Sequence, residues 1–101
     1  MADRPTRPKV RLRLCFSKRG RARYLSHKDM IRVWERAFRR AELPLAYSTG
    51  FSPGPELRFG PPLPVGYEGY NELLDVDLEE TVPPGPFLHS LAQVLPSGLV
   101  A

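Results

Sequence analysis

The sequence VRLRLCFS, residues 10–17, sets the pattern from which the fold follows. Apolar residues occupy every second position of this stretch: Val10, Leu12, Leu14 and Phe16. An alternation with a period of two is typical of a strand with one buried face. The stretch therefore predicts a half-buried strand that carries Arg11, Arg13 and Cys15 on its other face.

Two further strands are predicted downstream. Leu74, Val76 and Leu78 alternate with acidic residues, which repeats the period of two. Residues 50–69 hold five Gly and five Pro, and this segment is interrupted by a short strand around Leu57 and Phe59. In that short strand Arg58 is expected to face the other way.

A helix is predicted between the first two strands. Ser26 and Asp29 have the spacing of a capping box at a helix start, and Pro44 stops the helix near Glu42. The apolar residues at helical spacing form the expected buried stripe: Met30, Ile31, Trp34, Ala37, Phe38 and Ala41.

A second helix is predicted after Pro83, with Phe87, Leu88, Leu91 and Val94 as its apolar face. The resulting order, β-α-β-β-α, is that of an α+β ferredoxin-like plait that lacks its last strand. That strand would begin at Leu99 and lie beside the first one, so its absence exposes the first strand as an edge. A chain of 101 residues suits one domain, here 9–101, preceded by a disordered arm at 1–8.

The charge is distributed unevenly along the chain. Residues 1–58 hold all 15 Lys and Arg and five acidic residues, whereas residues 59–101 hold six acidic residues and no Lys or Arg. The first part therefore carries +10 and the second −6 within a net charge of +4. A plait pairs its first and third strands, so Arg11 and Arg13 are expected to face Asp75 and Asp77.

The other basic residues form a turn followed by a helix face, which suits a phosphate backbone. The candidate nucleic-acid contacts are Lys18, Arg19, Arg21, Arg23, Lys28, Arg32, Arg36, Arg39 and Arg40. Tyr24, Tyr47 and Phe51 are candidates for stacking on the bases of single-stranded RNA. The alternative is a solvated helix face with these aromatic residues in the core.

Few residues are candidates for catalysis. His27 stands at the helix start, where an ordinary imidazole suits general-base chemistry, but Ser26 and Asp29 beside it are better explained as caps. Cys15 is expected to be an inert thiol on a strand. One Cys and two His exclude an internal disulfide and leave no metal site. No apolar run reaches the length of a membrane span and no secretory signal is present, so a cytoplasmic protein without a membrane partner is expected.

The loop at residues 47–55 is a candidate ligand loop. Its glycines permit close approach to a ligand, and its hydroxyls can bond a phosphate or a substrate group. The residues proposed for this role are Tyr47, Ser48, Gly50, Phe51, Ser52 and Gly54. The loop matches neither a P-loop nor a dinucleotide fingerprint. The alternative is a rigid connector held by its prolines.

A long string of motifs resembles one bacterial family. It comprises Arg13, Phe16-Ser17-Lys18, Gly20, Arg23-Tyr24-Leu25-Ser26-His27, Asp29, Glu35-Arg36-Ala37, Arg39-Arg40-Ala41, Pro44, Ala46-Tyr47-Ser48, Gly50-Phe51, Pro53, Pro55, Phe59, Pro62-Leu63-Pro64 and Gly66. These residues resemble the radical-SAM-associated domain of unknown function, the radical SAM-linked protein family. The resemblance covers roughly residues 9–95.

The resemblance implies a domain that stands alone or lies C-terminal to a radical SAM enzyme. Genes of such domains often neighbour those of ribonuclease E/G-type enzymes and ribosomal proteins. Family members continue past the end of this chain, and many have His where Gly54 stands here. This chain has no Cys-x-x-x-Cys-x-x-Cys motif, so an iron–sulfur cluster and S-adenosylmethionine would belong to a partner radical SAM enzyme.

The sequence thus predicts an accessory binding domain that works with a radical SAM protein in cis or trans and contacts RNA or a ribosome-linked or RNA-processing partner. One alternative is a protein–protein adaptor that docks through the exposed first strand. Another is an RNA-processing or RNA-modifying enzyme that uses His27 and the 47–55 loop.

Overall fold

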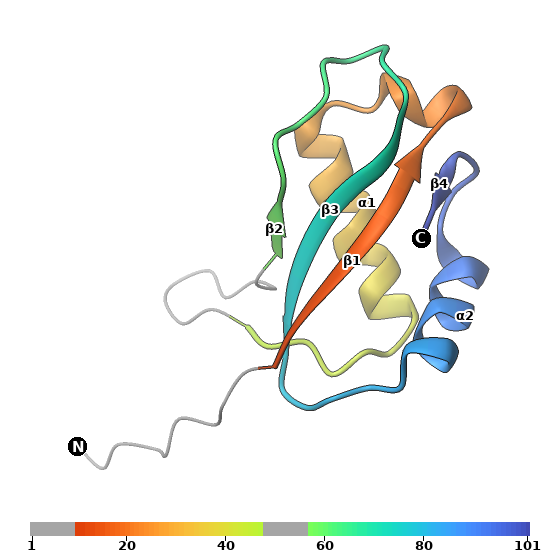
Figure 1. The fold of residues 1–101 in the computed structure, drawn as a ribbon. Coiled ribbons are helices and arrows are strands. Elements are labelled where there is room, and N and C mark those ends of the chain that lie inside the picture. The colour runs from red at the N-terminus through yellow and green to blue at the C-terminus, as the bar shows by residue number, and fades with distance from the viewer. Residues whose placement is uncertain (1–9, 48–56) are drawn as a thin grey trace.

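A computed structural model describes residues 10–47 and 57–101 of the chain (Figure 1). The elements follow in the order β1 (Val10–Lys18), the 3-10 helix η1 (Gly20–Tyr24), α1 (His27–Arg40), β2 (Leu57–Phe59), β3 (Gly69–Leu78), α2 (Pro84–Val94) and β4 (Leu99–Val100). The strands form one antiparallel sheet in the order β2-β3-β1-β4. Both helices cover the same face of this sheet (Figure 1). The predicted α+β plait is confirmed.

The last strand of the plait, β4, is present but has only two residues. Leu99 and Val100 of β4 pair with Lys18 and Ser17 of β1, on the side of β1 where the plait requires this strand. The prediction placed its start at Leu99 correctly, although it treated the strand as lacking. Along Val10–Phe16 no strand of the described ranges lies on that side of β1. This part of β1 is the edge that the sequence indicated.

Helix α1 begins as its sequence predicts. The Ser26 Oγ accepts a hydrogen bond from the Asp29 N–H at 3.1 Å, and the Asp29 carboxylate accepts one from the Ser26 N–H at 3.4 Å. This reciprocal pair is a capping box. The helix ends at Arg40, slightly before the predicted end near Glu42, because Glu42 adopts a left-handed conformation with φ of 57°.

The core lies between the sheet and the two helices. Trp34 and Phe38 of α1 and Leu91 of α2 are fully buried, and the Trp34 ring packs 4.9 Å from that of Phe16 on β1. Two predictions for the helix faces need correction. Ile31 is partly buried but does not pack against the core, and Leu88 is 41% exposed, because neither position turns far enough toward the sheet. Ala41 and Val94 are also only partly buried, but both pack against the core.

The open face of the sheet carries a network of ion pairs that connects β1, β3 and β2. Arg13 pairs with Asp75 and Arg11 with Asp77 in the strand register, as predicted. Arg58 of β2 adds a 3.1 Å bond to Asp77. Asp77 is only 4% exposed, so its burial is compensated by two arginines. These arginines are therefore engaged within the sheet.

No helix within residues 10–47 and 57–101 is long and apolar enough to cross a membrane.

Candidate functional site

The exposed side of α1 carries a row of basic residues, which we call the helix row: Lys28, Arg32, Arg36, Arg39 and Arg40. Four of them recur at intervals of four residues, so their Cα atoms follow one another at about 6 Å along the helix. The opposite side of α1 is anchored in the core through Trp34 and Phe38. The predicted basic helix face is therefore exposed and held on a rigid element.

The helix row has little internal compensation. Glu35 lies 3.9 Å from Arg39, and both side chains are partly exposed, so this pair is weak. Arg32, Arg36 and Arg40 have no carboxylate within 4.0 Å in the described part of the chain. Together with Glu35 and Arg39 they surround an open depression of about 280 Å³. The depression presents several guanidinium groups to solvent, which is the chemistry that binds phosphate oxygens.

A second surface, which we call the arginine–tyrosine end, lies where η1 meets the segment before β3. Arg19 stacks over the ring of Tyr70 with 4.9 Å between the guanidinium carbon and the ring centroid. Arg23 stacks over Tyr24 at 4.5 Å in the same way. Distances of this kind are those of cation–π contacts.

Glu68 holds the arginine–tyrosine end together. Its carboxylate accepts a 2.8 Å bond from the Gly20 N–H and a 2.9 Å bond from the Tyr70 hydroxyl. The bond from Gly20, followed by that from Tyr70, holds the pKa of Glu68 below its ordinary 4.5. The same hydroxyl bond raises the pKa of Tyr70 above 10.0. The basic turn thus has an acidic neighbour in space that is remote in sequence.

Lys18 does not belong to either surface. The sequence placed it in an exposed basic turn, but β1 continues through it and its side chain is only 4% exposed. Its ammonium group donates a 2.9 Å bond to the Leu25 carbonyl oxygen. Burial lowers the pKa of Lys18 from its ordinary 10.5, and the negative charge of Glu72 opposes that shift. The prediction that Lys18 is exposed is wrong, because Lys18 links β1 to the start of α1.

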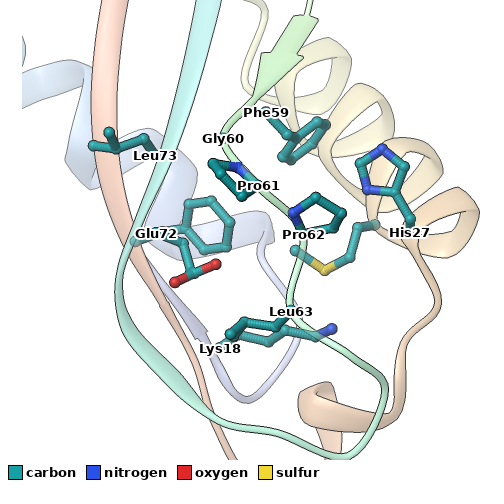
Figure 2. Close-up of a pocket in the computed structure, with 11 residues that line it drawn as sticks. Lys18, His27, Phe59, Gly60, Pro61, Pro62, Leu63, Glu72 and Leu73 are labelled. Atoms are coloured by element: carbon teal, nitrogen blue, oxygen red, sulfur yellow. The ribbon is translucent and has the colours of Figure 1, made fainter.

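A small pocket lies beside the start of α1 (Figure 2). His27 stands on one side of it and Glu72 on the other, with Pro61 and Pro62 between them. Lys18 also lines the pocket. The pocket volume of about 30 Å³ has room for roughly two water molecules.

His27 is exposed and packs edge-on against the Phe59 ring, with 5.5 Å between the ring centroids. Ser26 and Asp29 are engaged with each other as helix caps, as the sequence analysis favoured. Across residues 10–47 and 57–101 no hydrogen bond to the His27 ring is present. The structure thus places His27 at a pocket but brings it no acid–base partner from the capping box.

Most of the candidate ligand loop lies outside the described residues. This applies to Ser48, Gly50, Phe51, Ser52 and Gly54. Tyr47 is described and is 45% exposed. Cys15 is an exposed free thiol on β1. No group of three or more His, Cys, Asp or Glu residues in the described ranges could hold a metal ion.

Tyr67 also belongs to the arginine–tyrosine end, because the N–H of its neighbour Gly66 donates a hydrogen bond to the Arg23 carbonyl oxygen. Neither Tyr67 nor Tyr70 was predicted from the sequence as a site residue. Tyr67 lies within the Gly- and Pro-rich residues 50–69, Tyr70 directly follows them, and both tyrosines are more than 60% exposed. A segment so rich in glycine and proline forms little regular structure that could bury an aromatic ring. The composition around these tyrosines could therefore have indicated that they are exposed. Their proximity to Arg19 and Arg23 depends on the return of the chain to η1.

The fold and the two surfaces define a small α+β plait domain with a basic helix and an arginine–tyrosine end. The chain belongs to the family described as an uncharacterized protein conserved in bacteria (DUF2344), whose family model matches residues 11–101. No curated protein and no solved structure matches the chain.

Proposed function

We propose that this chain is an accessory RNA-binding domain that acts in the cytoplasm with a radical SAM enzyme supplied in cis or in trans. The observation that carries the RNA part is the helix row, in which Arg32, Arg36 and Arg40 are exposed and have no acidic partner among the residues described. The radical SAM part is supported by the sequence resemblance alone. In this proposal the iron–sulfur cluster and S-adenosylmethionine belong to the partner enzyme.

Counterion release favours RNA as the ligand of the helix row. Each phosphate that a guanidinium group neutralises releases condensed counterions, so affinity falls linearly with salt on a logarithmic plot. A row of arginines spaced along a rigid helix can contact successive phosphates without the entropic cost of ordering a loop. The arginines of the open sheet face are excluded from this surface, because Asp75 and Asp77 already compensate them.

The test replaces Arg32, Arg36 and Arg40 together by Gln and measures binding to a single-stranded RNA oligonucleotide over a series of salt concentrations. We expect weaker binding and a salt slope smaller by roughly 2, since each single-strand phosphate contact contributes about 0.7. The control adds the same change in net charge elsewhere, with Ala92→Glu, Gln93→Glu and Ser97→Glu, which are exposed positions on and after α2. An equal loss in both variants, or no RNA binding by the parent at low salt, contradicts the proposal.

The partnership is tested separately. The purified chain and a radical SAM protein of the same bacterium are mixed and run together by size-exclusion chromatography, with and without RNA. We expect a common peak. Independent elution under both conditions contradicts the partnership and leaves the RNA-binding proposal standing.

A further inference from the structure

Three tyrosines stand exposed at the arginine–tyrosine end of the molecule. Tyr24 is 59% exposed, Tyr67 is 63% exposed and Tyr70 is 62% exposed. Exposure of large aromatic rings to water is unfavourable, and a group of them on one surface is typical of a binding site. None of the three belongs to the buried core of the domain.

Hydrogen bonds between two chain segments bring the residues that carry the three rings to the same end of the fold. The Gly66 N–H donates a 2.6 Å bond to the Arg23 carbonyl oxygen, which places Tyr67 and Tyr24 on neighbouring segments. Glu68 connects the same segments a second time by accepting a hydrogen bond from the Gly20 N–H. Figure 1 shows η1 and the connection from β2 to β3 together at this end of the sheet.

Two of the rings are already fixed in place by their neighbours. Arg19 covers part of Tyr70, and Arg23 covers part of Tyr24, while both rings remain more than half exposed. The Tyr70 hydroxyl is also bound to Glu68. A ligand that stacks on these rings therefore pays little additional side-chain entropy. The surrounding charge is positive, because Arg19, Arg21 and Arg23 outnumber Glu68.

We propose that the arginine–tyrosine end is a stacking platform for unpaired nucleotides. This inference rests on the proposed RNA-binding function and names its ligand class, single-stranded RNA. Bases of a single strand expose their ring faces to aromatic side chains, whereas those of a duplex are covered by their neighbours. The helix row would neutralise phosphates of the same strand while the tyrosines hold its bases. Tyr67 is the best probe, because its side chain has no hydrogen-bond partner in the described ranges.

The experiment compares the parent with Tyr67→Ala, Tyr67→Phe and the double variant Tyr67→Ala/Tyr70→Ala. Binding is measured for a single-stranded oligonucleotide and for a hairpin of equal length. We expect each Ala substitution to weaken single-strand binding by about 5- to 150-fold, the range for one stacked base. The hairpin affinity and the salt slope should change little, and Tyr67→Phe should bind like the parent. Val65→Ala is the matched control, since it removes exposed apolar surface at the same end without removing a ring.

The outcomes separate the platform from the proposed function. If the parent binds RNA and the helix-row variant weakens it while the tyrosine variants do not, the platform is overturned and the proposed function stands. If Val65→Ala weakens binding as much as Tyr67→Ala, or if hairpin and single strand lose equally, stacking is overturned. If the tyrosine variants bind both RNAs like the parent but no longer co-elute with the radical SAM protein in size-exclusion chromatography, the surface is a protein interface and the inference is wrong. If the parent binds no RNA, both proposals fail.

Discussion

Arg13 and Asp75 face each other across β1 and β3 and form two parallel hydrogen bonds, Nε to Oδ1 at 2.8 Å and the terminal nitrogen to Oδ2 at 3.1 Å. A fork of this kind is the strongest arrangement of a guanidinium and a carboxylate. It ties the two central strands of the sheet on the face that no helix covers (Figure 1).

This pair predicts an acid-sensitive stability. The bond from Arg13 holds the pKa of Asp75 below its ordinary 3.8. A carboxyl group whose pKa is lower in the folded state stabilises the fold above the unfolded pKa, and this contribution is lost as the pH falls through the folded pKa. Asp75→Asn should lower the urea midpoint at pH 7 and make the decline below about pH 4 shallower. The measurement is urea unfolding at pH 7, 5 and 3.

The control for that experiment is Glu80→Gln, an exposed carboxylate after β3. It should leave both the midpoint at pH 7 and the acid decline close to those of the parent. An Asp75→Asn curve parallel to that of the parent at every pH would show that the Arg13 pair contributes no linked stability.

The two leucines of α2 should differ sharply in their contribution to stability. Leu91 is fully buried, whereas Leu88 is 41% exposed. Leu91→Ala should reduce the free energy of unfolding by about 2–5 kcal/mol, because it removes buried methyl groups and leaves a cavity. Leu88→Ala should change it by less than about 0.5 kcal/mol. Chemical denaturation of both variants tests this prediction. Comparable losses of unfolding free energy would contradict the assignment of Leu91 to the buried face of α2 and of Leu88 to its exposed face.

The capping box at Ser26 should contribute measurably to stability. Ser26→Ala removes the acceptor for the Asp29 N–H and should cost about 1 kcal/mol of unfolding free energy. Ser97→Ala, an exposed serine outside both helices, is the comparison and should be nearly neutral. Thermal unfolding followed by circular dichroism gives both values, and a neutral Ser26→Ala would mean that the box does not stabilise α1.

Gly98 should not tolerate a side chain. Its φ is 97°, and a Cβ atom there would meet the Arg19 carbonyl oxygen and the Ala22 side chain. Gly98→Ala should therefore destabilise the protein by more than about 1 kcal/mol. It should also disturb η1, since the Arg19 N–H donates a 2.8 Å bond to the Gly98 carbonyl oxygen.

Gly85→Ala is the matched control for that prediction. A Cβ atom at Gly85 meets nothing within 4 Å, and the residue lies in the first turn of α2. The substitution should stabilise the protein by roughly 0.4–1 kcal/mol through loss of entropy in the unfolded chain. The same loss of stability in both variants would mean that neither the φ value nor the close approach at Gly98 matters.

Local patterns in the sequence were sufficient to predict most of the fold. The alternation around Leu12 and Leu14 indicated β1, and the spacing of Ser26 and Asp29 indicated the start of α1. The facing of Arg13 and Asp75 followed once the plait was assumed, because its first and third strands are neighbours. The helix row was visible for the same reason, since residues four apart on a helix share one side.

Lys18, Tyr67 and Tyr70 show where prediction from the sequence ended. Whether Lys18 is exposed depends on how far β1 extends and on the Leu25 carbonyl oxygen that accepts a hydrogen bond from its ammonium group. The positions of Tyr67 and Tyr70 depend on contacts with residues more than 40 positions earlier in the chain, such as the bond from Gly20 to Glu68. Periodicity reports which face of an element is buried, but it does not report which distant segments meet.

Local sequence patterns were enough to predict β1, β2, β3, both α-helices and the basic side of α1, because backbone geometry repeats over a few residues and side-chain polarity follows that repeat. Which of the charged side chains remain available to a ligand depends instead on the three-dimensional fold. Arg11 and Arg13 are compensated by the aspartates of β3, and Lys18 is withdrawn into the fold. Arg19 and Arg23 are stacked on tyrosines, while Arg32, Arg36 and Arg40 face solvent. Electrostatic interactions depend on distance in space, and contacts between segments that are distant in the sequence determine which groups lie close to each charge.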